Sequence, residues 1–211
     1  DLVVVQGDRR EHSFVGAYRL ADGEQVWRMA RDETSTWATP NIVRAASGDE
    51  LVTNGRVIRS YEPRTGRLLW TLGPNSEVVV ATPVVGEGKA FITAGYPPVR
   101  PIYAIRPGHR GDLTLAGDRR ESDAIAWSHE RGGTYIPTPI LYRGHLYLVN
   151  NNGILSCYRA DTGERVYQTR LGEVGASFSA SPVAADGRLY FASETGEVYV
   201  LRAGPAYELL V

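Results

Sequence analysis

Short segments in which apolar and small or polar residues alternate follow one another along the whole chain, separated by turns that contain glycine. Residues 146–149, Leu-Tyr-Leu-Val, and 189–192, Leu-Tyr-Phe-Ala, are two examples. Alternation with a period of two is typical of β-strands that bury one face. Each example is followed by a turn that needs positive φ, at 151–153 and at 194–196. No segment keeps apolar residues at the helical period over the ~11 residues that a helix requires, so the pattern predicts an all-β chain.

Three sequence markers recur in the same order. A Thr-Pro or Ser-Pro pair opens four units, and its prolines lie 43, 56 and 43 residues apart. A Tyr followed five residues later by Gly occurs five times, and an aromatic residue stands four residues after that Gly at Trp27, Trp70 and Tyr167. In the longest unit we expect Trp127 to take this position. Four short strands repeated every ~40–45 residues are typical of β-propeller blades, so we expect the recurring aromatics to pack between blades. The pairs are Thr39-Pro40, Thr82-Pro83, Thr138-Pro139 and Ser181-Pro182.

The markers divide the chain into five units of a single β-propeller domain. The first unit starts on its second strand and the last ends on a fourth strand at Tyr207–Val211, which amounts to about 4.75 blades. An open arc leaves apolar faces exposed at both ends, so we expect the remaining blades of a larger ring to lie outside this chain. The predicted blades are a partial one at 1–30 and others at 37–73, 80–130, 135–172 and 178–211.

The third unit is longer than the others, and its additional residues lie in an insertion at 108–124. Within the insertion we expect Gly111–Ala116 to form an extra small hairpin, while residues 118–123 are highly charged. Two roles stay open for this segment: a tolerated surface excursion, or a loop that contacts a partner.

Composition excludes several classes of function. The 23 basic and 24 acidic residues give a net charge of −1, which argues against nucleic acid or an anionic membrane as the partner. No apolar run reaches the ~20 residues of a transmembrane segment. Cys157 is the single cysteine and the four histidines are dispersed, so we predict no metal site. Ser128, His129 and Glu130 are consecutive strand residues that point to alternate faces, so they form no catalytic triad. We predict no catalytic residue.

Candidate binding residues come from the loops that enter the first strand of each blade, because these loops lie near the central channel of a propeller. They carry Trp37, Tyr135 and Phe178 just before the Thr/Ser-Pro pairs, and aromatic side chains at such a rim suit a peptide strand or a flat ligand. His129 and Arg131 complete the predicted set for a ligand or partner. The alternative for the aromatics is packing under the neighbouring blade. For the charged segments 31–33 and 129–131 the alternative is exposure as solvated loops.

Two segments carry a family resemblance. Residues 60–70, Ser-Tyr-Glu-Pro-Arg-Thr-Gly-Arg-Leu-Leu-Trp, and 157–167, Cys-Tyr-Arg-Ala-Asp-Thr-Gly-Glu-Arg-Val-Tyr, resemble the tryptophan-docking motif of the PQQ-repeat (pyrroloquinoline-quinone-like, BamB-like) β-propeller family. Residues 17–27 are a looser copy, and 181–190 fits as well. The resemblance covers essentially the whole chain. It implies a quinoprotein-like propeller of four-stranded antiparallel blades, in which this chain is an arc of a seven- or eight-bladed ring.

The resemblance implies three alternative functions. The first, which we expect, is a non-enzymatic binding or scaffold propeller, periplasmic or extracellular, with a protein or peptide partner and no cofactor. The second is a fragment of a PQQ-dependent quinoprotein dehydrogenase. Such enzymes hold PQQ with calcium through Glu, Asn and Asp oxygens and cover the quinone with a disulfide of adjacent cysteines, which Cys157 alone cannot form. The polar run 150–153 is expected to be a hairpin turn rather than a ligand set. The third function is the sensor domain of a membrane-anchored receptor.

Overall fold

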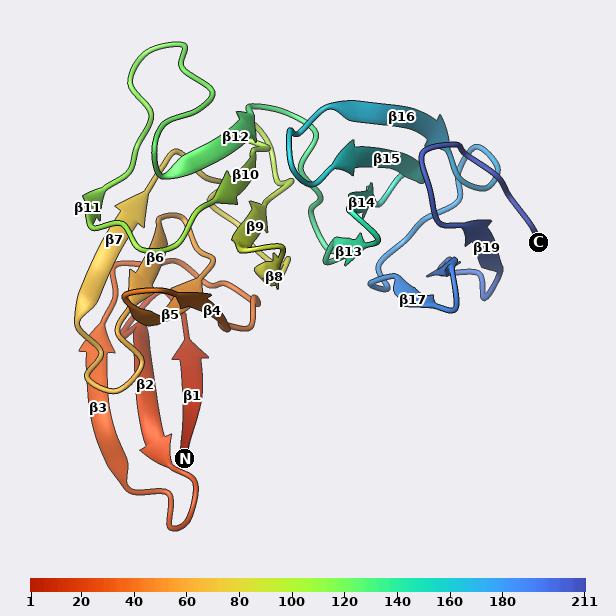
Figure 1. Cartoon of the computed structure of the whole chain (residues 1–211). Coiled ribbons are helices and arrows are strands. Elements are labelled where there is room, and N and C mark those ends of the chain that lie inside the picture. The colour runs from red at the N-terminus through yellow and green to blue at the C-terminus, as the bar shows by residue number, and fades with distance from the viewer.

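The structure, a computed structural model, describes all residues 1–211. It holds 19 β-strands in five small sheets and has no helix, as the alternating pattern predicted. The sheets follow one another in chain order along a curved path, from the N-terminal sheet at the lower left of Figure 1 to the C-terminal sheet at the right. We number them sheet 1 to sheet 5 in that order.

Each sheet is antiparallel, apart from the short strand β11. Sheet 1 holds β1 (Leu2–Gly7), β2 (Phe14–Arg19) and β3 (Gln25–Ala30). Sheet 2 holds β4 (Asn41–Ala45), β5 (Gly48–Thr53), β6 (Ile58–Tyr61), β7 (Leu68–Leu72) and β11 (Gly111–Asp112). Sheet 3 holds β8 (Val84–Gly86), β9 (Lys89–Thr93), β10 (Ile102–Ile105) and β12 (Ile125–His129). Sheet 4 holds β13 (Ile140–Tyr142), β14 (His145–Val149), β15 (Ile154–Arg159) and β16 (Arg165–Arg170), and sheet 5 holds β17 (Val183–Ala185), β18 (Arg188–Ala192) and β19 (Val198–Arg202).

The Thr/Ser-Pro pairs link successive sheets through their hydroxyl groups. The Thr39 amide donates to Thr82 Oγ1 at 3.3 Å, and the Thr82 amide donates to Thr138 Oγ1 at 3.1 Å. The Thr138 amide donates in turn to Ser181 Oγ at 3.0 Å. The first strands that follow these pairs, β4, β8, β13 and β17, contact one another in series. The marker recurs because each unit needs a backbone amide for one neighbour and a hydroxyl for the other.

The aromatic marker takes the same register position in four sheets. It stands on the last antiparallel strand, opposite a small residue of the strand before it, and each pair is followed by an irregularity of the register. Trp127 therefore occupies the position that the insertion displaces in the sequence, as predicted. The pairs are Ala17 with Trp27, Ser60 with Trp70, Ala104 with Trp127, and Cys157 with Tyr167.

Two of these tryptophans dock onto a turn of the next sheet. Trp127 Nε1 donates to the Ala160 carbonyl at 3.1 Å, and a Cβ atom at Gly163 would overlap the Trp127 ring. Glycine fits beneath the indole because it has no side chain and accepts φ of 73°. Trp27 repeats the arrangement on the turn 63–66 of sheet 2, with an indole-to-carbonyl distance of 3.0 Å.

The apolar core lies between successive sheets. Separate clusters join sheet 1 to sheet 2, sheet 2 to sheet 3, sheet 3 to sheet 4, and sheet 4 to sheet 5. Trp70, Phe91 and Tyr147 are among the largest fully buried side chains. Burial of one such side chain contributes ~1.5–3 kcal/mol, so stacking of the sheets stabilises the fold and the repeated aromatics are packing residues.

The insertion does not form the hairpin predicted for Gly111–Ala116. Gly111 and Asp112 instead form β11, which adds to the outer edge of β7 in parallel, and the Leu113 amide donates to the Thr71 carbonyl at 2.8 Å. An outer strand offers free backbone donors and acceptors, and these satisfy the inserted segment better than a two-stranded ribbon without a core. The rest of the insertion arches away from the sheets between β11 and β12 (Figure 1).

The last segment of the chain also differs from the prediction. Residues 207–211 do not form a regular fourth strand of sheet 5. Leu209 makes an isolated antiparallel bridge with Leu201, and the Val200 and Arg202 amides donate to the Val211 and Glu208 carbonyls at 2.8 and 3.0 Å. The segment thus lies along β19, where a fourth strand is expected, but the Val200 carbonyl accepts two consecutive amides at 2.8 and 3.4 Å, which makes the register irregular.

The charged segment 31–33 is only partly a solvated loop, the alternative considered for it. Asp32 is exposed, but the side chains of Arg31 and Glu33 are fully buried between sheets 1 and 2. Arg31 Nε lies 2.8 Å from Asp8 Oδ1, while Glu33 pairs with Arg59 and accepts backbone amides at 2.7 and 3.2 Å. Buried charges are tolerated when each is paired and hydrogen-bonded, which is why this network can replace apolar packing at the junction.

Candidate functional site

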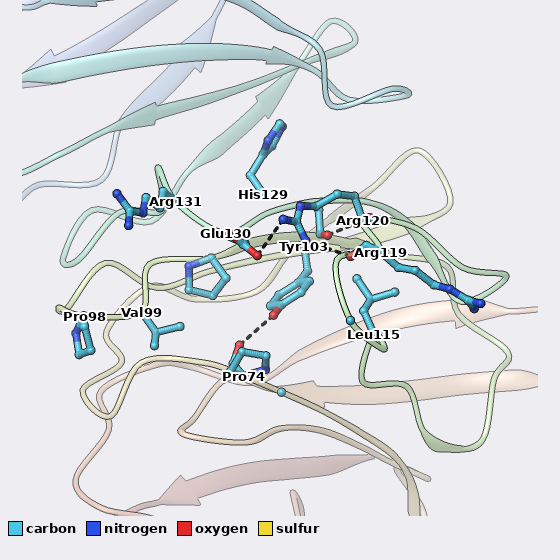
Figure 2. Close-up of a pocket in the computed structure, with 14 residues that line it drawn as sticks. Pro74, Pro98, Val99, Tyr103, Leu115, Arg119, Arg120, His129, Glu130 and Arg131 are labelled. Atoms are coloured by element: carbon cyan, nitrogen blue, oxygen red, sulfur yellow. Dashed lines mark hydrogen bonds and ion pairs between the residues drawn. The ribbon is translucent and has the colours of Figure 1, made fainter.

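A pocket of about 330 Å³ lies where sheets 2 and 3 meet the insertion (Figure 2). One wall is Pro74, directly after β7, and a second is the loop 98–101 between β9 and β10. The insertion contributes Leu115 and residues 119–120, and the end of β12 contributes 128–131. Figure 2 shows Tyr103 of β10 pointing toward Pro74 between these walls, and its hydroxyl donates to the Pro74 carbonyl at 2.8 Å.

Glu50 of β5 fixes the base of the insertion. Its side chain is fully buried, and Oε2 accepts the indole N–H of Trp70 at 2.9 Å. Oε1 accepts the Gly108 amide at 3.0 Å and the Arg110 guanidinium at 2.8 Å. Sequence reasoning missed Glu50. The available signal was a carboxylate directly before Leu51-Val52, a position where a strand that packs against a neighbour is expected to be apolar.

The polar side chains of the pocket hold its walls together. Arg120 pairs with Glu130 at 2.8 Å, and both side chains are largely exposed, so this ion pair contributes at most ~1 kcal/mol. Ser128 Oγ donates to the Arg120 carbonyl at 2.8 Å. Burial raises the pKa of Tyr103 to about 12, with the Glu130 carboxylate adding to the rise and Arg120 opposing it. Tyr103 is therefore protonated at neutral pH and acts as a hydrogen-bond donor.

Two of the five predicted binding residues belong to this pocket. Arg131 is exposed and stands on its rim. The His129 ring points away from Tyr103 in Figure 2, and its Nε2 lies 2.7 Å from the Gly163 carbonyl of sheet 4. The ring packs against Trp127 and Tyr158 with centroids 5.6 and 5.2 Å apart. His129 thus connects the pocket wall to the next sheet.

The three predicted rim aromatics lie at three different junctions, before sheets 2, 4 and 5, and do not form one patch. Trp37 is 62% exposed, and its amide donates to the Val79 carbonyl at 2.9 Å. Tyr135 is half-buried, with its ring 5.4 Å from that of Tyr96. Phe178 is fully buried in the cluster between sheets 4 and 5. The packing alternative therefore holds for Phe178, whereas Trp37 and Tyr135 stay predictions as binding residues.

One alternative implied a quinone held by calcium through Glu, Asn and Asp oxygens, and three observations on this chain bear on it. Nowhere in the structure do three or more His, Cys, Asp or Glu side chains gather in a way that would hold a metal ion. Cys157 is buried inside sheet 4, where burial raises the pKa of its thiol to about 12. The run 150–153 is a hairpin turn, as predicted, closed by a hydrogen bond of 2.8 Å from the Gly153 amide to the Asn150 carbonyl. The side-chain amide of Asn151 donates to the Phe178 carbonyl at 3.0 Å.

Comparison with known proteins gives matches over nearly the whole chain. A family model described as outer membrane protein assembly factor BamB matches residues 11–203. BamB of Escherichia coli K12 is 26% identical over 208 residues, which cover 93% of this chain and 46% of that protein. BamB of Shigella dysenteriae serotype 1 gives the same values. The chain therefore spans about half the length of the curated relatives it matches. No helix in the structure has the length and hydropathy needed to cross a membrane.

Solved structures share the β-propeller fold. BamB from Moraxella catarrhalis matches with a TM-score of 0.62 and 15% identity, over 96% of this chain and 57% of that one. The quinohemoprotein alcohol dehydrogenase ADHIIG from Pseudomonas putida HK5 matches with a TM-score of 0.67 and 14% identity, over 100% of this chain and 40% of that one. The computationally designed Ika8 protein matches with a TM-score of 0.64 and 12% identity, over 96% of this chain and 55% of that one. These identities show the fold alone, whereas the family model covers most of the sequence: the chain belongs to the BamB-like family of PQQ-repeat β-propellers.

Proposed function

We propose that the chain is a non-enzymatic scaffold that binds a protein or peptide partner in the periplasm or outside the cell. The observation that carries the proposal is the pocket between sheets 2 and 3, where an insertion anchored by buried Glu50 holds arginine side chains beside an apolar surface. Loops held on a rigid frame are the usual binding elements of such folds. The relatives' name, outer membrane protein assembly factor, supports a protein partner and an extracytoplasmic location.

The proposal includes a closed ring of seven or eight blades, of which this chain supplies about 4.75. Apolar side chains on the terminal sheets support it. Val3 and Val26 of sheet 1 are 44% and 46% exposed, and Val183 and Val198 of sheet 5 are 61% and 52% exposed. Further sheets of the ring would cover both faces, as the sheets within the chain cover one another.

The proposal assigns the chain no catalytic residue and no cofactor. The local geometry supports this choice, because Ser128 Oγ donates to a backbone carbonyl and His129 Nε2 lies on the Gly163 carbonyl. Neither side chain is engaged with the other, so they form no nucleophile and base pair. Cys157, the single cysteine, cannot form the disulfide of adjacent cysteines that covers the quinone in such enzymes, which supports the same choice.

Site-specific photocrosslinking in cells tests the proposal. A benzoylphenylalanine in place of Arg131 is expected to give one discrete protein adduct, and the same residue in place of Arg44, an exposed arginine on β4, is expected to give none. Equal adducts at both positions, or none at either, would contradict the scaffold function. Titration of the protein with PQQ and Ca²⁺ is the second arm: stoichiometric binding with a shift of the quinone absorbance would instead support the dehydrogenase.

A further inference from the structure

We infer that the pocket between sheets 2 and 3 takes a short acidic peptide segment that places one apolar side chain between the pocket walls. The inference rests on the proposed function and narrows its partner to a chemical class. Two features of the pocket carry it: apolar side chains on facing walls of a limited volume, and a rim on which two of the three arginines are not neutralised within the chain.

The interior of the pocket suits a single large apolar side chain. Pro74 and Val99 provide apolar surface on one side and Leu115 provides it on the other, with the Tyr103 ring between them (Figure 2). The volume of about 330 Å³ lies at the lower end of the ~300–1,000 Å³ of small-molecule pockets. Such a space accommodates one aromatic or aliphatic anchor, and an anchor of this kind supplies most of the affinity of a short peptide.

The rim carries an excess of positive charge. Arg119, Arg120 and Arg131 line it, and Glu130 is the one carboxylate among the lining residues. Glu130 is paired with Arg120, whereas the guanidinium groups of Arg119 and Arg131 have no hydrogen-bond or ion-pair partner. The local excess contrasts with the net charge of −1 of the whole chain. A guanidinium binds a carboxylate through two parallel hydrogen bonds, so the two unpaired arginines favour acidic residues beside the anchor.

The site is held in place before any ligand arrives. The Glu50 carboxylate fixes the start of the insertion through Gly108 and Arg110, and Ser128 Oγ fixes residue 120 at 2.8 Å. Each fixed wall reduces the ordering that binding would otherwise require. A preorganised pocket of this kind binds a short segment without refolding of the insertion.

Fluorescence anisotropy tests the inference on the protein that carries this chain. The probe is a short fluorescein-labelled peptide with acidic residues on both sides of one phenylalanine. Two matched peptides replace the phenylalanine by serine or the acidic residues by lysine. We expect the first peptide to bind, and each replacement to weaken binding by at least about tenfold, because each removes one of the two interactions.

Charge reversal at the rim provides the protein variant. Arg119→Glu combined with Arg131→Glu is expected to weaken the first peptide by at least about tenfold and to make its binding less dependent on salt. The matched control is Arg44→Glu with Arg64→Glu, which changes the net charge equally at exposed arginines outside the pocket and is expected to change binding by less than about twofold. All four side chains are exposed, so the variants are expected to fold, and their unfolding curves verify it.

The outcomes separate this inference from the proposed function. Equal binding of the lysine peptide, equal binding of the serine peptide, or equal loss in the Arg44/Arg64 control would overturn the inference. Binding of anionic phospholipid vesicles that competes with the peptide and disappears in the rim variant would replace the peptide by a membrane. If photocrosslinking at position 131 succeeds while the peptides fail, the scaffold function stands and the partner class is wrong. If the peptides bind but no crosslink forms in cells, the pocket chemistry stands and the scaffold function fails.

Discussion

Two junctions between neighbouring sheets use the same repeated tryptophan in different ways. Between sheets 3 and 4, Trp127 donates its indole N–H to a backbone carbonyl and covers Gly163. Between sheets 2 and 3, Trp70 donates instead to the buried carboxylate of Glu50, which also accepts the Gly108 amide. The repeated side chain sets the spacing of the sheets, while its acceptor is chosen locally. Where the acceptor is a side chain, the turn no longer has to lie under the indole, and the insertion starts there.

The two arrangements differ in their energetics. A backbone carbonyl that accepts an indole N–H remains neutral, whereas a buried carboxylate must be matched by several donors to offset its lost hydration. Glu50 has Trp70, Gly108 and Arg110 as donors. The junction between sheets 2 and 3 therefore depends on one residue to a degree that the junction between sheets 3 and 4 does not.

Removing the tryptophans is expected to have the largest effect. Trp127→Ala is expected to lower the free energy of unfolding by about 3–5 kcal/mol through the cavity it leaves. Trp70→Ala is expected to lower it further, because Glu50 would also lose a donor in a buried site. Urea unfolding of both variants measures the difference. A smaller loss for Trp70→Ala than for Trp127→Ala would mean that the carboxylate contributes nothing to this junction.

The carboxylate itself is the next test. Glu50→Ala is expected to lower the free energy of unfolding by about 2–4 kcal/mol, since it leaves a buried indole N–H and the Gly108 amide without an acceptor. Glu130→Ala, which removes an exposed ion pair at the same pocket, is the matched control and is expected to cost less than about 1 kcal/mol. Similar losses in the two variants, measured by thermal or urea unfolding, would show that Glu50 is not the anchor of the insertion.

Alanine substitutions at two equivalent glycines sharpen the comparison. Gly163 and Gly108 both have positive φ, at 73° and 103°, so alanine is strained at each by roughly 1–2 kcal/mol. A Cβ atom overlaps the Trp127 ring at Gly163, while at Gly108 its nearest neighbour is Ser47 Oγ at 3.9 Å. We expect Gly163→Ala to lower the free energy of unfolding by about 1–3 kcal/mol more than Gly108→Ala. Equal losses would indicate that the indole does not rest on the turn.

The smallest expected effect is a pH dependence of the stability at the junction between sheets 2 and 3. Tyr103 has a pKa raised to about 12 by burial, against an ordinary value of about 10. The folded state holds this proton more tightly, so the associated stability is present below pH ~10 and is lost as the pH rises toward ~12. Tyr103→Phe is expected to flatten the loss of stability in that window. Tyr147→Phe, at a tyrosine of sheet 4 with a pKa also raised to about 12 by burial, is expected to have the same kind of effect and tests it at a second site. If neither variant changes the alkaline unfolding curve, these hydroxyls do not ionise before the fold is lost.

Much of the fold could be predicted from the sequence because it depends on local pairing. The period-two pattern predicted the strands, and the spacing of Tyr, Gly and aromatic residues placed Trp127 correctly across the insertion. The parallel strand β11 could not be predicted, because it forms on an edge supplied by β7, about 40 residues earlier in the chain. A repeat shows which strands pair within a unit, but it does not predict which other segment pairs with the free edge of a sheet.

The candidate site was less predictable for the same reason. The sequence predicts Arg131 and His129 as binding residues, and that role stays a prediction for both. The pocket around them needs Pro74 from a distant part of the chain, and its anchor, Glu50, meets Gly108 and Arg110 across 58 and 60 residues. A charged residue has the same letter whether it is solvated or buried in a network, as Arg31 also demonstrates. A local pattern can mark such a residue as unusual, as the carboxylate before Leu51-Val52 does, but it does not identify the distant partner.

The hydroxyl-to-amide links between the Thr/Ser-Pro pairs have a consequence for how such a chain changes in length. Thr82 and Thr138 each donate a backbone amide to the next pair and accept one at the hydroxyl from the previous pair, so units of this kind can follow one another in series. Duplication or deletion of a complete period leaves the series of links intact, whereas loss of half a period leaves one amide and one hydroxyl unmatched. The four Thr/Ser-Pro pairs therefore favour changes of chain length by whole repeat units.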